Sequence, residues 1–414
     1  MRKEKLNYYL VMFLMFFTYG LIFAKTVHIK GAIYQINTPM LATGVFLLVF
    51  IIFNIRYLRN YIEFWMDRKI GFLIIFIYIV YSMILPFVIN PDFAFQTFMK
   101  ILPLILFIFL YPYLMECDYL DKVLNFIAYI FVIAGILAFI MYALGYCGAG
   151  LSLHTVVRLV SKQETLNSFG EKRLFWILTH KSRYAAFCII GIIIIYKDKL
   201  MPNIIKYFGI IINLIDLYLA NSMTYLAVFV VMTVLYLIYS KRENIKERFS
   251  YIFKNPISKI ILAIIVCGII ALGSFGFVKY LGEKRDVLTI GHRTDIWKAT
   301  LREIGKHPEG IIKMPDDPWI RTEKFQDYVK FTNGHNIFFN EAILNGVAGA
   351  ILYGIVLIYF LILLGKKKDK IYLFGFIAII LGAMFDNVMD CEFLYIFYIT
   401  LALVLSEGKR KIYS

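Results

Sequence analysis

Long apolar runs alternate with short polar connectors along most of the chain. A helix needs about 20 predominantly apolar residues to cross a bilayer. Twelve runs approach or reach that length, and none shows the strict alternation typical of membrane β-strands. They are residues 7–24, 39–55, 70–89, 94–115, 123–146, 184–197, 204–220, 222–240, 260–278, 337–364, 371–386 and 391–406. The pattern predicts an all-α polytopic membrane protein with about 12 transmembrane helices, forming a single integral membrane domain over residues 1–414.

Composition and charge agree with a membrane location and suggest an orientation. Hydrophobic residues make up 61% of the chain and charged residues 17%, with a net charge of +16. Lys and Arg gather in every second connector, which places both termini in the cytoplasm by the positive-inside rule. The strongly basic connectors are residues 56–69, 241–259, 365–370 and 407–414. No basic patch belongs to an aromatic-rich soluble domain, so nucleic acid is not an expected partner.

Two connectors on the predicted outer side are much longer than the rest, residues 147–183 and 279–335. Loops of this length are usually functional, and we expect short amphipathic helices in both. In the larger loop, apolar residues recur at helical spacing from Ile296 to Ile304, and Arg293 and Trp297 share one face. We expect this helix at the outer membrane–water boundary, where Trp anchors and Arg binds lipid phosphate.

The smaller loop places cations among aromatic side chains in the stretch EKRLFWILTHKSRYAAF, residues 171–187. Its cations are Lys172, Arg173, Lys181 and Arg183. This arrangement suits an anionic head group on a lipid tail, although the same residues could simply flank the next span.

Motifs for other chemistries are weak or missing in the sequence. Asp316 and Asp317 lie between two prolines, which favours a turn over a divalent-metal site. There is no Gly-rich phosphate loop, GxSxG or HExxH motif, and the five cysteines are scattered without a CxxC. We therefore expect neither a metal nor a cofactor.

Acidic residues also occur inside or beside the apolar runs, where they are costly and usually face protein or a cavity. They are Asp216, Glu341 with Asn345 on the same helix face, and a cluster of Asp386, Asn387, Asp390 and Glu392. They indicate either hydrogen bonds between helices or a polar cavity that opens outward.

His335 and Asn336 open an apolar run directly after the largest polar stretch. An imidazole can accept a proton near neutral pH, and arginines bind pyrophosphate bidentately. A histidine and arginines converging at the outer lip of the membrane therefore suit glycosyl transfer from a lipid pyrophosphate. The alternative role for His335 is an interfacial cap on the helix.

The region 291–354 resembles the signature region of the bacterial O-antigen polymerase and O-antigen ligase superfamily. The matching residues are Arg293, Trp297, Pro308, Gly310, His335, Asn336, Gly346 and Gly349. A second match is Arg173 with His180, Lys181 and Ser182, and a weaker one is LANSMTYLAVF, residues 219–229. Ser182 and Met223 depart from the pattern, which favours Asn and Arg at those positions.

The resemblance implies a metal-independent, inverting glycosyltransferase acting on undecaprenyl-pyrophosphate-linked oligosaccharides in the bacterial inner membrane. It implies that His335 is the general base, and that Arg173 and Arg293 bind pyrophosphate, with Arg183 as the alternative to Arg173. His180, Lys181, Trp297 and Asn336 are further candidates for substrate binding.

We expect a polymerase of O-antigen or capsular polysaccharide with its active site facing the periplasm or the cell exterior. The alternatives are an O-antigen ligase that uses another acceptor such as lipid A core, and a flippase or transporter of lipid-linked glycan. Beyond its glycan substrate and membrane lipids, expected partners are a chain-length regulator and the flippase of the same pathway.

Overall fold

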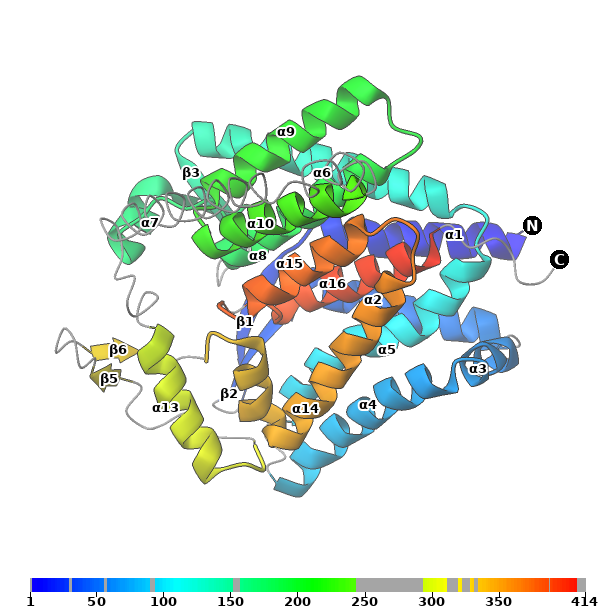
Figure 1. Ribbon diagram of the computed structural model, residues 1–414, viewed down its shortest axis with the longest axis horizontal. Helices are drawn as coiled ribbons and strands as arrows, with labels where there is room; N and C mark the ends of the chain where they lie inside the picture. Colours follow the sequence, from blue (N-terminus) through cyan, green and yellow to red (C-terminus); the bar gives the residue numbers. More distant parts are fainter. Residues whose placement is uncertain are drawn as a thin grey trace, which may run out of the picture.

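The computed structural model describes residues 2–29, 32–55, 58–89, 94–151, 157–242, 293–310, 319–321, 328–330, 334–386 and 388–407. Helices dominate this part of the chain (Figure 1). They are α1 (Arg2–Met15), continued by the π-helical turn η1 (Phe16–Gly20), α2 (Thr38–Asn54), α3 (Leu58–Met66), α4 (Lys69–Ile89), α5 (Ala94–Glu116), α6 (Leu120–Ala143), α7 (Lys162–Phe169), α8 (Lys181–Lys197), α9 (Asn203–Leu219), α10 (Met223–Ser240), α13 (Arg293–Lys306), α14 (Ile337–Gly365), α15 (Ile371–Ala383) and α16 (Cys391–Ser406).

Helices occupy eleven of the twelve predicted spans, and the remaining one, residues 260–278, lies outside the described residues. Among the described helices, α4, α5, α6, α10 and α14 are long and apolar enough to cross a membrane. The bent pair α2 and α3 makes a sixth if it counts as one span, while α15 and α16 are apolar but shorter. The polytopic helical architecture is thus supported, whereas the total of twelve spans stays a prediction.

Three two-stranded antiparallel hairpins add to the helices and were not predicted. They pair β1 (Ala24–Ile29) with β2 (Ala32–Asn37), β3 (Tyr146–Leu151) with β4 (Val157–Ser161), and β5 (Trp319–Arg321) with β6 (Tyr328–Lys330). The strands are only three to six residues long, so a search for membrane-length apolar runs passes over their short alternating pattern. The expected short helices are present, α7 in the first long loop and α13 in the second.

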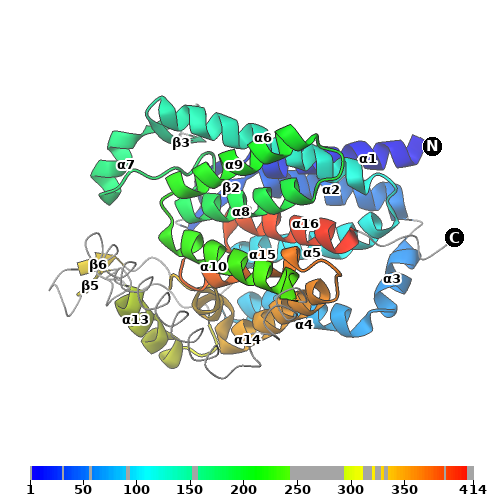
Figure 2. The same ribbon diagram turned by 45° about the horizontal axis from the view of Figure 1, so that its top comes forward.

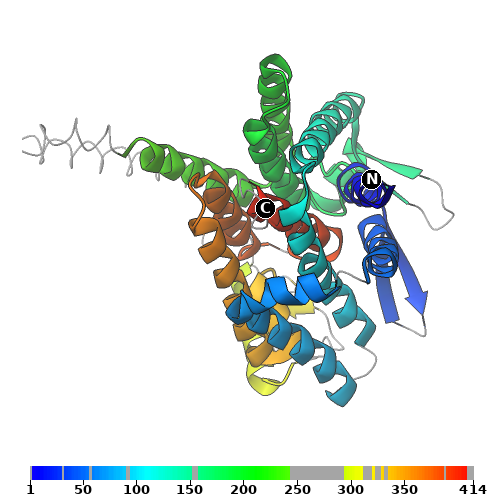
Figure 3. The ribbon, with the colours of Figure 1, turned by 90° about the vertical axis from the view of Figure 1, so that its right-hand side faces the viewer.

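The two ends of the helical bundle differ in what they carry. Helix α1 begins and α16 ends at one end, and α7, α13 and the β5–β6 hairpin lie at the other, as Figures 1 and 2 show. Figure 3 views the end at which α1 begins. We call these the terminal end and the loop end.

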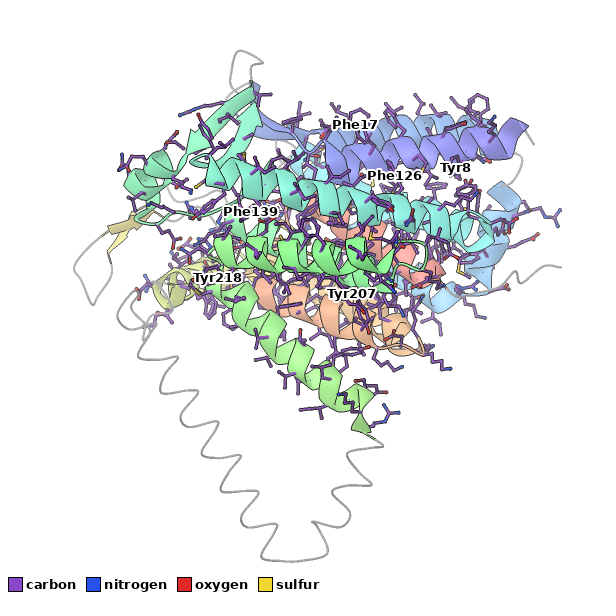
Figure 4. The ribbon with its side chains drawn as sticks, turned by 90° about the horizontal axis from the view of Figure 1, so that it is seen from above. Tyr8, Phe17, Phe126, Phe139, Tyr207 and Tyr218 are labelled. Carbon is purple, nitrogen blue, oxygen red and sulfur yellow. The ribbon has the colours of Figure 1, made fainter. Side chains whose placement is uncertain are left out.

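The interior of the bundle is built around two helices that are buried on all sides. Residues 181–195 of α8 and residues 392–406 of α16 are buried without exception. A helix that is apolar on every face is typical of the centre of a large or membrane-embedded protein. The outer helices instead expose apolar side chains, and Tyr207 and Tyr218 on α9 are each 62% exposed (Figure 4). Exposed apolar surface of this extent fits contact with lipid.

Helix α14 is broken near its start, and the break fixes its first turns. Gly346 has φ 69° and ψ 177°, and the N–H of Val347 donates to the carbonyl of Pro308 at 2.9 Å. A Cβ on Gly310, which has φ 88°, would lie 2.0 Å from the nitrogen of Gly346. The turn of residues 308–310 therefore fits into the break only because both positions are glycine. This contact holds α13 against the short helical segment that begins at Ile337.

Candidate functional site

His335 and Asn336 have different roles at the start of α14: Asn336 caps the helix, and the His335 side chain lies beside Asp386. The Asn336 side chain accepts from the N–H groups of Phe338 and Phe339 at 2.9 and 3.2 Å, which makes it the N-cap of α14. Its amide also donates to the carbonyl of Met384 at 2.8 Å. His335 has φ 44°, an unusual value for a residue other than glycine. The pair therefore joins the start of α14 to the turn between α15 and α16.

Asp386, in that turn, is the point where three distant segments meet. Its Oδ2 lies 3.3 Å from Nη2 of Arg293 on α13, and its Oδ1 lies 3.6 Å from Nδ1 of His335. The hydroxyl of Ser182, at the start of α8, also donates to Asp386 and lies 3.1 Å from the hydroxyl of Ser222. The Asp386 side chain is only 4% exposed, whereas that of His335 is 27% exposed. The carboxylate is thus an internal anchor, and the imidazole is accessible.

The charges around Asp386 fix its ionisation. Burial by itself raises the pKa of this carboxyl, but contacts with His335, His180, Arg293 and Ser182 outweigh burial and hold the pKa well below its usual range. Asp386 is therefore an anion at neutral pH. It can orient His335 and stabilise the positive charge that the imidazole acquires when it takes up a proton.

His180 is the N-cap of α8, and its Nδ1 accepts from the N–H of Ser182 at 3.2 Å. Burial lowers the pKa of His180 to about 4; Asp386 opposes that shift, and the cations Arg183, Arg173 and Lys181 reinforce it. His180 is therefore neutral at pH 7. With Nδ1 acting as an acceptor, Nε2 carries the proton and can donate a hydrogen bond.

Trp297 holds α13 in place beside Asp386. Its ring packs against Phe385 with the centroids 5.7 Å apart, and against Phe339 at 6.1 Å and an interplanar angle of 88°. Arg293 and Trp297 lie on one face of α13, as predicted, and that face is turned toward the α15–α16 turn. Trp297 thus packs against protein on this side, and its expected position at the membrane boundary stays a prediction. Its indole Nε1 is buried and has no hydrogen-bond partner among the described residues.

A second cationic cluster lies beside His180. The Lys181 ammonium donates to Glu171 and, at 3.2 Å, to the carbonyl of Asn221. Arg173 Nη1 is 3.8 Å from Glu171, which also accepts from the Asn221 amide at 3.0 Å. Ser222 follows Asn221 and is hydrogen-bonded to Ser182, so the cluster is continuous with the Asp386 group. The weakly matched stretch 219–229 therefore contributes to the site.

Arg183 is held in the interior between α8 and α16. Its side chain is 6% exposed, and Nη1 lies 3.2 Å from both oxygens of Glu392, which is fully buried. Nη2 lies 3.7 Å from Asp390, and the guanidinium also donates to Thr179. A cation in the first turn opposes the helix dipole, so these carboxylates compensate for both burial and the dipole. Arg183 joins the two buried helices at the loop end.

The acidic candidates Glu341 and Asp216 make contacts of their own, apart from the Asp386 group. Glu341 accepts from the Tyr78 hydroxyl at 2.8 Å and from the Asn345 amide at 2.5 Å, and Asp216 accepts from Tyr184 at 2.7 Å. These contacts favour hydrogen bonding between and along helices over a catalytic role. The paired acids at residues 316–317, the candidate metal site, lie outside the described residues.

Sequence reasoning named the cations and the histidines but not their partners. Asp386 and Glu392 were recognised only as part of an acidic cluster, and Glu171 and Ser222 were not singled out. The available signal was the position of these acids at the predicted outer ends of apolar runs. Which cation each acid faces depends on how α8, α13 and α16 pack, and no local pattern encodes that.

Residues 208–354 match the family model described as O-antigen ligase. This range runs from α9 to the middle of α14 and includes Ser222, Arg293 and His335, while Arg173 and Asp386 lie outside it. No curated protein shows significant similarity to the chain. The matched region supports the resemblance to the O-antigen ligase and polymerase superfamily that the motifs indicate.

Proposed function

We propose that the chain is a metal-independent glycosyltransferase that polymerises undecaprenyl-pyrophosphate-linked repeat units of an O-antigen or capsular polysaccharide. The family match supports a lipid-linked oligosaccharide as substrate. The observation that carries the proposal is the convergence of Arg293 and His335 on Asp386, with His180 close enough to affect its ionisation. A base, a fixed anion and a guanidinium in one group suit glycosyl transfer, in which a negatively charged pyrophosphate leaves.

In the proposed reaction, Nε2 of His335 takes the proton from a hydroxyl of the acceptor sugar. The hydroxyl oxygen attacks the anomeric carbon of the donor glycan from the side opposite the pyrophosphate. The new glycosidic C–O bond forms as the bond to pyrophosphate breaks, and the leaving group keeps the electron pair. The configuration at the anomeric carbon is inverted. Asp386, on the Nδ1 side of the ring, stabilises the imidazolium that results.

The cations have separate tasks in this proposal. Arg293 places one edge of its guanidinium toward Asp386, and a guanidinium has five N–H donors in a fork that suits phosphate oxygens. Arg173 and Lys181 form the second positive site, next to Asn221, and they supply positive charge beside Met223, where the family pattern favours Arg. The neutral His180 donates to a phosphate or sugar oxygen. Arg183 acts through position, because two carboxylates already face its guanidinium.

Asn336 and Trp297 are positioning residues in the same scheme. Asn336 fixes the backbone that carries His335, and Trp297 fixes the helix that carries Arg293. Both hold their neighbours against the α15–α16 turn, so a displaced turn would separate base from guanidinium. A displacement of about 1 Å can cost on the order of 100-fold in rate.

A reconstitution experiment tests the proposal. Purified full-length protein is incubated with lipid-linked repeat units, without nucleotide and with a chelator present. A polymerase yields a ladder of longer glycans on the lipid carrier. A ligase yields no ladder but moves glycan to an added acceptor such as lipid A core. Movement of labelled glycan across liposome membranes without any new glycosidic bond would overturn the enzyme reading in favour of a transporter.

A further inference from the structure

A cavity of about 440 Å³ opens at the terminal end of the bundle, far along the helices from Asp386. It lies where α8 and α14 end and α15 begins, with α5 and α16 completing the wall. Volumes in this range are typical of small-molecule sites. The helices α8 and α14 begin at His180 and Asn336, so the same two helices join the cavity to the proposed active site.

The lining of this cavity is strongly cationic. Five lysines contribute to it, Lys197, Lys199, Lys366, Lys367 and Lys368, against two carboxylates, Asp369 and Glu407. Lys197 is 2.6 Å from Asp369, and Lys199 is 3.8 Å from Glu407. Both carboxylates are therefore already engaged, one by the last lysine of α8 and one by a lysine of the connector that follows it.

Lys366 and Lys368 remain as uncompensated charges on the rim. Both are exposed, and neither has a carboxylate within 4.0 Å among the described residues. The deeper wall is apolar and aromatic, with Leu363, Leu405 and Tyr111. A cationic rim over an apolar floor matches a ligand that has a phosphate and an attached carbon chain.

Orientation in the membrane does not by itself account for this arrangement. The positive-inside rule requires only that lysines lie in the cytoplasmic loops near helix ends, and it does not require them to gather around one cavity. Here the end of α8 and the α14–α15 connector, far apart in sequence, are drawn together by the Lys197–Asp369 pair. Tyr236 of α10 donates to the same carboxylate at 3.3 Å. The connectors thus form one walled site.

We infer that the lysine cavity binds a phosphate-bearing anion, with the phosphate at Lys366 and Lys368. Two sources share that chemistry, the headgroup of an anionic phospholipid and a soluble phosphate. Each lysine near an anionic surface contributes about 1 kcal/mol, so loss of two predicts a roughly 30-fold fall in affinity. The inference does not depend on the proposed glycosyl transfer.

The test compares the wild-type chain with the double variant Lys366→Gln/Lys368→Gln. In one arm, the full-length protein is placed in nanodiscs of phosphatidylglycerol or of phosphatidylcholine, and retained lipid is counted by native mass spectrometry. In the other arm, inorganic phosphate is titrated against protein in neutral detergent, and the thermal unfolding midpoint is followed. The matched control is Lys5→Gln/Lys69→Gln, which removes two exposed charges that do not line the cavity.

We expect the wild type and the control to retain phosphatidylglycerol alike, and the cavity variant to lose roughly 30-fold in affinity. Stabilisation by inorganic phosphate that the cavity variant alone loses would identify a soluble phosphate as the ligand. If the cavity variant and the control behave alike in both arms, the inference is wrong. Melting of each variant in neutral detergent without phosphate shows whether the fold is intact.

Discussion

The two ends of the bundle carry positive charge in opposite ways. At the loop end, Arg183, Lys181 and Arg293 are mostly buried, and each faces a carboxylate. At the terminal end, Lys366 and Lys368 are exposed and have no such partner among the described residues. Buried pairs hold side chains in fixed positions, whereas solvated lysines remain mobile and available. The loop end is therefore built for precise geometry, and the terminal end for attraction of an anion.

The largest expected effect comes from removing the proposed base. His335→Ala should lower the rate of ladder formation by about 10²- to 10⁴-fold, because general base catalysis contributes factors of that size. The rate is measured with purified protein and lipid-linked repeat units. The control is His307→Ala, since His307 is half exposed and pairs only with Glu309 among the described residues. Equal rates for the His335 variant and the wild type would remove His335 from the mechanism.

Arg293 should come next. Arg293→Ala is expected to slow the reaction by about 10²- to 10³-fold, the usual cost of deleting one group that stabilises developing negative charge. Arg293→Lys keeps the charge but loses the second N–H edge, so it should recover only part of that rate. If lysine restored the full rate, positive charge alone would suffice at this position and the guanidinium fork would have no part in the reaction.

Replacing Arg183 should affect the stability of the fold, because its guanidinium pairs with a buried carboxylate. Arg183→Met leaves Glu392 buried without its guanidinium, which should lower the free energy of unfolding by about 3–5 kcal/mol. The thermal unfolding midpoint of the purified protein measures this loss. The double change Arg183→Met/Glu392→Gln should restore most of it, because no buried charge is then left unpaired. A single variant as stable as the wild type would mean that the pair does not join α8 to α16.

The smallest effect concerns pH. The pKa of His180 falls to about 4 in the folded protein, against about 6.5 in an unfolded chain. Between these values the unfolded state binds more protons, so this contribution to stability is complete above pH 6.5 and is lost as the pH falls toward 4. His180→Asn keeps a capping side chain but cannot titrate. Its unfolding midpoint should fall less than that of the wild type between pH 7 and pH 5.

The sequence predicted the parts of the site that follow local rules. The helix with Arg293 and Trp297 on one face followed from helical spacing, and the start of α14 followed from the sharp change at Asn336. The break at Gly346 was visible only as a glycine within an apolar run, since nothing local shows that residues 308–310 fill it.

Charge partners were the part that the sequence could not supply. Arg183 and Glu392 are separated by 209 positions, and their pairing exists because α8 and α16 lie side by side in the interior. The packing of Trp297 on Phe385 was missed for the same reason, because Phe385 comes from a different part of the chain. Patterns of hydrophobicity identify which residues are buried, but not what they are buried against.

The docking of residues 308–310 on Gly346 also bears on how His335 is held. Gly310 abuts the break in α14, and the N–H of Gly334 donates to Asn340 at 2.8 Å on the same short helical segment. Gly310 and Gly334 therefore both contact the first turns of α14. This short segment, its Asn336 cap and His335 would thus move together as one unit.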